Sequence, residues 1–362
     1  MLKLATVFTG IGAPEQALKQ LGIKYEIVFA CDNGEIELKT PYEELDKLVK
    51  KFNQKKRNEY IKNVYSSTGK ENFVKKSYFA NYKISEEKWY EDIRFINGKS
   101  YRRKIDLLVG GSPCQSFSTY GKKKGFEDTR GTLFYHYAKL INESKPKVFI
   151  YENVPGIKSH DKGNTWKRIL EIFDEINYNM YYFVLNSQNY GLPQNRRRMF
   201  VVGFRKDLHI SDFSKPNEIE LSTKAKDYLD DYVPLKYYLG ERGFKWTTNV
   251  KKNQNRTRVN RDIIGCETAN QQFNWIGDLR VEKATQRTIE NDRIYKGMYN
   301  GELCVARKMT PNECLKLMGF KDFKIVVPDK EAYRQSGNSI AVPVMKALLG
   351  DVLERIKYEY NS

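Results

Sequence analysis

Residues 4–22, LATVFTGIGAPEQALKQLG, decide the fold class of this chain. Residues 4–8 are a mostly apolar run, which is typical of a strand buried on both faces. A glycine-rich turn follows at residues 9–13, Pro14 stands where a helix begins, and Gly22 ends the helical pattern. A strand, a tight turn and a helix in this order predict the first unit of an α/β fold.

Four more short apolar runs extend this pattern along the chain. They are residues 25–30, 105–109, 148–151 and 199–204. Strands that alternate with helices predict a mostly parallel sheet wound with helices. Ligands of such sheets bind at the carboxyl ends of the strands. The sequence places its glycines, Asp32, Cys114 and Glu152 at those ends, so we expect the functional site there.

The composition indicates a folded protein with a polyanionic partner. Lys and Arg number 63 and Asp and Glu number 45, so the formal net charge is +18. Such an excess favours nucleic acid first and an anionic membrane surface second. Hydrophobic residues at 40% and aromatic residues at 13% exclude a disordered polycation. A length of 362 residues suggests about two domains.

Neither a metal site nor export is indicated. The five cysteines are scattered without a CxxC, and the three histidines do not lie at metal-ligand spacing. The apolar run at the N-terminus is too short for a signal peptide, and no stretch of about 18 apolar residues could cross a membrane. We therefore expect a reduced, metal-free, cytoplasmic protein.

Two stretches interrupt the alternation of strands and helices. Residues 40–88 are rich in Lys, Asn and Tyr and predict a basic helical insertion. Its charges form either a solvated surface, which is the commoner case, or a contact with DNA. From about residue 206 to 307 basic and amide residues mingle with aromatic residues, which indicates a second domain. Residues 310–319 then carry the cap, proline and glycine signals of a helix.

Residues 111–118, GSPCQSFS, carry the strongest local signal for chemistry. A single cysteine is usually an inert core residue, but Cys114 follows a proline at the end of a predicted strand and opens a polar segment. That position would expose a thiol that nearby cations could ionise. A nucleophile and a buried thiol both stay open on these residues alone. The basic residues 122–124 are typical of a loop that closes over an anionic substrate.

Three other features could complete a site. Glu152 ends the next buried strand, so its carboxylate would lie beside the same crevice, and a cap or loop glutamate is the alternative. Arg196 and Arg198 are alternate residues at the start of a strand, so we expect them to share one face, a solvated arginine run being the alternative. Asp32 could grip a ribose diol beside the glycine turn, although such a residue is more often a surface cap.

Taken in order, these motifs resemble the DNA cytosine-5 methyltransferase family of bacterial and phage modification enzymes. The motifs are FTGIG, PCQ, ENV, QNRRR and RQSGNS, at residues 8–12, 113–115, 152–154, 194–198 and 334–339. Similar blocks lie at residues 128–134, 189–193 and 307–314. The two interrupting stretches do not match.

The resemblance implies an α/β fold: a Rossmann-like S-adenosylmethionine-dependent methyltransferase domain with a smaller target-recognition domain. The catalytic and cofactor-binding domain would comprise residues 1–225 and 330–362, with the basic insertion at 40–88. Target recognition would fall to residues 226–305, and residues 306–329 would form a hinge.

The resemblance also implies the chemistry. A methyl group would pass to carbon 5 of a cytosine flipped out of DNA, while the Cys114 thiolate adds to carbon 6. Glu152 would hold ring nitrogen N3, and Arg196 and Arg198 would donate near the base carbonyl.

Binding residues follow from the same resemblance. The cofactor is S-adenosyl-L-methionine, the product is S-adenosyl-L-homocysteine, and no metal takes part. The residues implied at the cofactor are Phe8, Gly10, Gly12, Asp32, Asp92, Ile93, Pro113, Asn338 and Ser339. The residues implied at the DNA are Gln115, Ser118, Tyr120, Lys122, Lys123, Lys124, Arg130 and Thr268.

The implied partner is double-stranded DNA. The resemblance also implies that the protein is a monomer and that it does not bind a membrane. A restriction endonuclease of the same system is a further partner that the resemblance allows. One alternative is the tRNA-methylating branch of the family, but its characteristic Cys-Phe-Thr insertion is absent here. The other is a non-catalytic DNA-binding relative, against which the intact Cys114 and Glu152 argue.

Overall fold

The computed structural model describes residues 1–112, 133–249, 257–270, 272 and 275–356. The chain divides into two compact units. The first comprises Met1–Leu185, Arg197–Asn217 and Met345–Ser362, and the second comprises Asn186–Arg196 and Glu218–Val344.

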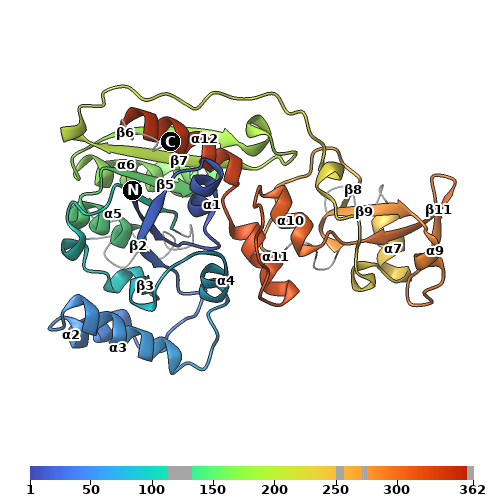
Figure 1. Ribbon diagram of the computed structural model, residues 1–362, viewed down its shortest axis with the longest axis horizontal. Coiled ribbons are helices and arrows are strands. Elements are labelled where there is room, and N and C mark those ends of the chain that lie inside the picture. Colours follow the sequence, from blue (N-terminus) through green and yellow to red (C-terminus); the bar gives the residue numbers. More distant parts are fainter. Residues whose placement is uncertain (113–132, 250–256, 271, 273–274, 357–362) are drawn as a thin grey trace. The chain divides into compact units, whose positions relative to one another are not determined.

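A seven-stranded sheet forms the centre of the first unit. Its strands are β1 (Leu2–Val7), β2 (Tyr25–Cys31), β3 (Trp89–Tyr90), β4 (Leu107–Gly110), β5 (Val148–Asn153), β6 (Tyr178–Asn186) and β7 (Arg197–Arg205). Their order across the sheet is β3-β2-β1-β4-β5-β7-β6 (Figure 1). The first five strands run parallel, and β7 runs antiparallel to β5.

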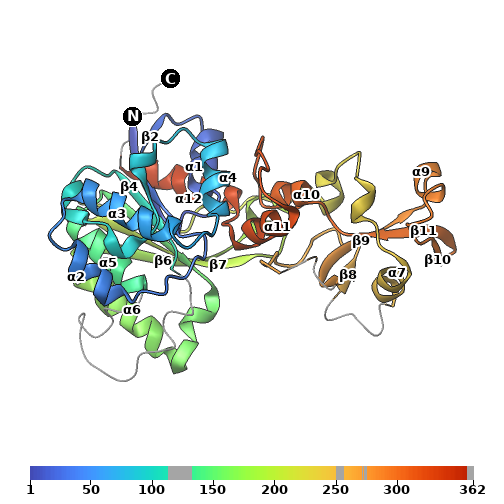
Figure 2. The same ribbon diagram turned by 90° about the horizontal axis from the view of Figure 1, so that it is seen from below.

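Helices cover both faces of this sheet. They are α1 (Ala13–Gln20), α5 (Leu133–Ser144), α6 (Asn164–Asp174) and α12 (Val342–Arg355). Figure 2 shows α1 and α12 on the opposite side of the sheet from α5 and α6. Phe134 and Tyr137 of α5 and Phe173 of α6 pack against Leu108 and Phe149 of the sheet, so this face carries the aromatic core.

The insertion at residues 40–88 forms three helices, α2 (Tyr42–Val49), α3 (Gln54–Ser66) and α4 (Phe73–Asn81). α2 and α3 enclose a small core of their own that includes Leu45 and Ile61. α4 packs on β2 through Tyr78, and Tyr82 just beyond the helix joins the same cluster.

The second unit holds a four-stranded sheet with the order β10-β11-β9-β8 (Figure 2). The strands are β8 (Thr257–Val259), β9 (Gly277–Lys283), β10 (Gly297–Tyr299) and β11 (Glu302–Arg307). The helices of this unit are α7 (Glu241–Thr248), α9 (Gln286–Ile289), α10 (Pro311–Leu317) and α11 (Asp329–Asn338). Phe244 of α7 packs with Leu279 and Val281 of β9.

The predicted α/β class is confirmed. Every predicted strand occurs, with ends displaced by no more than two residues, and the helix after the glycine turn begins one residue before Pro14. The helix predicted at residues 310–319 is α10. Its Thr310 hydroxyl accepts the Glu313 N–H, while the Glu313 carboxylate accepts the Thr310 N–H, as the capping signal requires.

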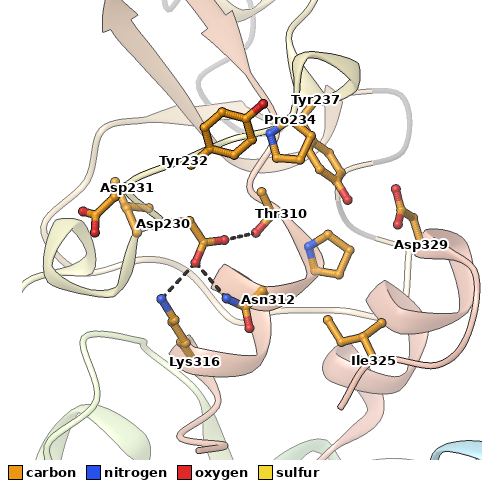
Figure 3. Close-up of a pocket in the computed structure, with 12 residues that line it drawn as sticks. Asp230, Asp231, Tyr232, Pro234, Tyr237, Thr310, Asn312, Lys316, Ile325 and Asp329 are labelled. Carbon is orange, nitrogen blue, oxygen red and sulfur yellow. Dashed lines mark hydrogen bonds and ion pairs between the residues drawn. The ribbon is translucent and has the colours of Figure 1, made fainter. Parts of the chain in front are cut away.

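The predicted boundaries differ from the two units in three places. We expected residues 186–196 and 218–225 to belong to the catalytic domain, but they lie in the second unit. We expected residues 306–329 to form a hinge and residues 330–362 to return to the catalytic domain, but residues 306–344 belong to the second unit. The physical reason is burial, because Met309, Leu317 and Tyr333 share one apolar cluster. Polar contacts add to it: Figure 3 shows the Asp230 carboxylate, which accepts hydrogen bonds from Thr310, Asn312 and Lys316.

The buried ion pair of this region yields a stability prediction. Arg307 is 1% exposed, and its guanidinium donates to both carboxylate oxygens of Glu313 at 2.8 and 3.0 Å. Arg307→Met would leave a buried carboxylate without its counter-charge, so we expect a loss of about 3–5 kcal/mol in the free energy of unfolding. Urea denaturation measures this loss. Lys283→Ala, which breaks only the exposed pair with Glu302, is the control, and equal effects of the two variants would contradict the prediction.

Candidate active site

The carboxyl ends of β1, β2, β4 and β5 meet at one edge of the sheet because these strands are parallel. β7 runs the other way, so its first residues lie at the same edge. Asn153, the last residue of β5, is paired with Met199 near the start of β7. The chain leaves β1 toward β2 on one side and later returns as β4 on the other, and this reversal of direction is where such sheets bind ligands.

The glycine turn, residues 8–12, follows β1 at this edge. Phe8, Gly10 and Gly12 have φ values of 52°, 53° and 77°, in the left-handed region. Glycine adopts this region freely, whereas a non-glycine residue such as Phe8 is strained there. Among the described residues, no atom beyond Gly10 and its two chain neighbours lies within 4 Å of the point where a Cβ on Gly10 would stand, which leaves space for a ligand beside the backbone of the turn.

Asp32 ties this turn to the end of β2. Its two carboxylate oxygens accept the backbone N–H groups of Gly10 and Gly34, each at 2.9 Å. Burial raises the pKa of the Asp32 carboxyl, and the two N–H donors lower it again in part. Asp32 therefore lies beside the glycine turn as the sequence predicted, with its orientation fixed by the backbone.

Asp92 and Ile93 follow β3, and contacts with neighbouring residues restrict both side chains. The Asp92 carboxylate pairs with Arg94 at 2.6 Å and accepts the Tyr65 hydroxyl at 2.9 Å. The Ile93 side chain lies in the hydrophobic core. The predicted contact of Asp92 and Ile93 with the cofactor stays a prediction.

The ends of β4 and β5 are fastened together. The Asn153 amide donates to the Ser112 carbonyl at 3.1 Å and to the Tyr151 hydroxyl at 2.7 Å. A Cβ on Gly111 would lie 2.7 Å from the Glu152 carbonyl oxygen and 3.0 Å from its Oε2, so the glycine permits the close approach of Glu152. Residue 112 is the last described residue before the PCQ motif.

Glu152 and Arg198 form an ion pair at this edge. Arg198 Nε lies 3.1 Å from Glu152 Oε1, and the two side chains are 16% and 15% exposed. β5 carries the acid, and the antiparallel β7 brings the arginine to the same end. A carboxylate and a planar guanidinium held side by side can meet the two polar edges of one planar ligand.

Arg196 does not share this surface, which corrects the prediction that Arg196 and Arg198 lie on one face. β7 begins at Arg197, so strand alternation does not extend back to Arg196. Arg196 is 2% exposed, and its guanidinium donates to the carbonyls of Glu267, Gly337 and Ser339 within the second unit. A guanidinium occupied by three carbonyls serves the fold of that unit.

Thr268 and Asn338 are presented by the same buried network. A Cβ on Gly337 would lie 2.2 Å from the Thr268 carbonyl carbon, so only glycine allows the Thr268 loop to pack on α11. The side chains of Thr268 and Asn338 are exposed, whereas Ser339 is buried and its carbonyl accepts from Arg196. Asn338 and Thr268 thus lie at the surface of the second unit.

Nine of the predicted site residues lie outside the described residues. They are Pro113, Cys114, Gln115, Ser118, Tyr120, Lys122, Lys123, Lys124 and Arg130.

Glu267 is a residue that sequence reasoning missed. It is 1% exposed, accepts the Ser336 hydroxyl at 2.7 Å, and adjoins the Arg196 network. Burial raises its pKa to about 8, while the Ser336 hydrogen bond and the charge of Arg196 oppose that shift. Glu267 stands directly before Thr268, but nothing in its neighbours signals that a charged side chain there is buried.

The raised pKa of Glu267 predicts a pH-dependent stability. Above about pH 4.5 the unfolded chain ionises this group, whereas the folded chain keeps the proton up to about pH 8, so the contribution of Glu267 to stability falls as the pH rises. Glu267→Gln keeps an acceptor for Ser336 and does not titrate. The Tm of the variant relative to the native chain should therefore rise between pH 5 and pH 8, and an equal difference at both pH values would show that Glu267 is ionised.

Two negative findings concern only part of the chain. Within the described ranges, no helix combines the length and apolarity needed to cross a lipid bilayer. Among the same residues, no three His, Cys, Asp or Glu side chains gather closely enough to hold a metal ion.

Sequence comparisons define the class of protein. Residues 2–354 match the family model of C-5 cytosine-specific DNA methylase. The type II methyltransferase M.HpaII of Haemophilus parainfluenzae is 37% identical over 75% of this chain and 78% of its own length. The type II methyltransferase M.HhaI of Haemophilus parahaemolyticus is 35% identical over 75% of this chain and 83% of its own length. The chain therefore belongs to the C-5 cytosine-specific DNA methylase family and is a DNA cytosine-5 methyltransferase.

Solved structures agree on the fold. A DNMT2 of Spodoptera frugiperda superimposes with a TM-score of 0.66 at 18% identity, over 98% of this chain and all of that one. The first unit is accordingly a Rossmann-like α/β domain.

Proposed function

We propose that this chain methylates carbon 5 of one cytosine within a specific double-stranded DNA sequence, with S-adenosyl-L-methionine as the methyl donor and S-adenosyl-L-homocysteine as the product. The observation that carries this proposal is the ion pair of Glu152 and Arg198 at the carboxyl edge of the sheet. In a cytosine methylase, the carboxyl group would meet ring nitrogen N3 of the base, and the guanidinium would meet the base carbonyl.

The residues around the glycine turn fit the cofactor. The open space at Gly10 suits close approach of a ligand to the backbone, and Asp32 beside it suits a ribose diol. Phe8 packs partly against the core and can offer the rest of its ring to an adenine. Asn338, in the second unit, is exposed and is proposed as a further contact. The bound cofactor would supply an electrophilic methyl group on a sulfonium.

The protein's own residues would activate the base. Carbon 5 of cytosine is a poor nucleophile, so the Cys114 thiolate would add to carbon 6 and push electron density toward carbon 5. Glu152 would hold a proton at N3, and Arg198 would donate to the base carbonyl, where negative charge develops. Carbon 5 then takes the methyl group, the proton on carbon 5 leaves, and the carbon–sulfur bond to Cys114 breaks.

This chemistry requires the cytosine outside the stacked duplex. The net charge of +18 favours binding to the phosphates, and Lys122, Lys123 and Lys124 are proposed to contact them near the flipped base. Residues 226–305, with the exposed Thr268, are proposed to select the DNA sequence. A restriction endonuclease of the same recognition sequence is the partner that the type II names of the relatives suggest.

A methyl-transfer assay tests the function. The purified chain, incubated with S-adenosylmethionine that carries a radioactive methyl group, should label double-stranded DNA at 5-methylcytosine and leave tRNA unlabelled. Bisulfite sequencing of plasmid DNA from expressing cells should then show one methylated cytosine in one recurring sequence. Label in tRNA alone, or in neither nucleic acid, would refute the proposal.

A further inference from the structure

We infer that residues 65–82 of the insertion are a positioning element for the cofactor pocket, with Tyr82 and Asn72 as its principal positioning residues. This inference rests on the proposed function, because it assumes that the glycine turn and Asp32 hold S-adenosylmethionine. It assigns a role to a stretch in which the sequence showed no family motif and that composition alone describes as a basic surface.

Tyr82 is hydrogen-bonded to the backbone of the glycine turn. Its hydroxyl lies 2.9 Å from the Ile11 carbonyl and 2.8 Å from the Gly12 carbonyl, so one proton is shared between two backbone acceptors. A Cβ on Gly12 would lie 2.3 Å from the Tyr82 ring. Residue 12 must therefore be a glycine for two reasons: its φ is positive, and a side chain there would collide with the Tyr82 ring.

Asn72 holds the neighbouring loop in the same way. Its amide nitrogen donates to the Asp32 carbonyl at 2.9 Å and to Glu91 at 2.8 Å. Its amide oxygen accepts the Lys75 N–H and so caps α4. Asn72, the N-cap of α4, thus also fixes the backbone of Asp32. The Asp32 carboxylate in turn accepts the Gly10 N–H.

The hydroxyls of two more tyrosines of the insertion donate hydrogen bonds to acidic side chains beside this pocket. The Tyr65 hydroxyl donates to Asp92 at 2.9 Å, and the Tyr78 hydroxyl donates to Glu15 at 2.5 Å. Glu15 is fully buried in the first turn of α1, directly after the glycine turn, and burial raises its pKa to about 7. The hydroxyl of Thr6 donates to the same oxygen, Oε1, so Glu15 connects β1 and α4 beneath the turn.

Two of the three lysines within residues 65–82 argue for this role over a DNA contact. Lys75 pairs with Glu86 at 2.8 Å, and Lys76 pairs with Glu71 at 2.8 Å. Charges that are neutralised by neighbouring glutamates attract phosphate weakly. Four polar side chains of this element, by contrast, reach residues around the proposed pocket, namely Tyr65, Asn72, Tyr78 and Tyr82. A pocket made of loop backbone binds tightly only when its loops are held before the ligand arrives.

Tyr82→Phe tests the inference, because it keeps the ring beside Gly12 and removes only the hydroxyl. Isothermal titration calorimetry with S-adenosyl-L-homocysteine should show a Kd raised about five- to tenfold, the effect of one hydrogen bond. The KM for S-adenosylmethionine should rise by the same factor, while kcat at saturating cofactor and the Kd for DNA stay within about twofold. Asn72→Asp, which retains the cap acceptor of α4, should weaken the cofactor in the same selective manner.

Tyr60→Phe is the matched control. Tyr60 lies on α3 with its ring against Phe52, and the variant should bind the cofactor as the native chain does. A native chain that binds no S-adenosylhomocysteine would overturn the proposed function itself. A native chain that binds it with the same Kd as Tyr82→Phe would overturn only the inference. Loss of DNA affinity without loss of cofactor affinity in Tyr82→Phe would also overturn it and make the insertion a DNA contact.

Discussion

Cys114→Ser is expected to abolish methyl transfer, with kcat lower by at least about a thousandfold. The serine hydroxyl has a pKa far above that of a thiol, so almost none of it is ionised at neutral pH and the addition to carbon 6 fails. Cofactor binding should remain nearly intact, because the glycine turn and Asp32 make their contacts without this residue. Turnover with saturating DNA and calorimetry with S-adenosylhomocysteine measure the two quantities separately.

DNA that contains 5-fluorocytosine provides the second measurement. Fluorine cannot leave carbon 5 as a proton does, so the native chain should remain covalently attached to this DNA in denaturing gels. Cys114→Ser should form no such adduct. Cys266→Ser, at a half-buried cysteine of the second unit, is the control. This variant should retain methyl transfer and should form the covalent adduct with the 5-fluorocytosine DNA. Full activity of Cys114→Ser would remove the cysteine from the mechanism.

The sequence predicted five of the seven strands in the sheet of the first unit, and it placed Asp32 and Glu152 at the carboxyl ends of two of them. Apolar runs that end in Asp32 and Glu152 have a simple physical meaning, because buried parallel strands are short and deliver their last residues to a common edge. The capping pattern around Thr310 was equally direct, since it depends on residues close in sequence. β6 (Tyr178–Asn186) was not predicted, because its alternation of aromatic and polar residues is weak.

The contacts that sequence could not predict are those between distant segments. Arg196 looked equivalent to Arg198, and its burial follows only from carbonyls 71 and 141 residues farther along the chain. Gly12 looked like a ligand-contacting glycine, but it also admits the ring of Tyr82, 70 residues away. The basic insertion looked like a solvated surface because its lysines dominate the composition, whereas its tyrosines and asparagines carry the structural information.

Glu152 and Arg198 are expected to act as a unit in catalysis. Glu152→Ala and Arg198→Ala should each lower kcat about 10²- to 10³-fold, because each removes a group that meets charge developing on the base. The double variant should lose less than the product of the two factors, since the 3.1 Å ion pair makes the position of each side chain depend on the other. Single-turnover rates at saturating DNA and cofactor measure this coupling.

Arg197→Ala is the matched control for this cycle. Arg197 is exposed and precedes Arg198, so its loss should leave kcat nearly unchanged even if it weakens DNA binding slightly. Glu152→Gln should retain more activity than Glu152→Ala, because an amide can still donate to N3 although it cannot hold a transferable proton. The double variant removes both charges and leaves no unpaired carboxylate, so its Tm should match or exceed that of Arg198→Ala. Losses that multiply in the double variant would mean that the two residues act independently and that the ion pair serves the fold alone.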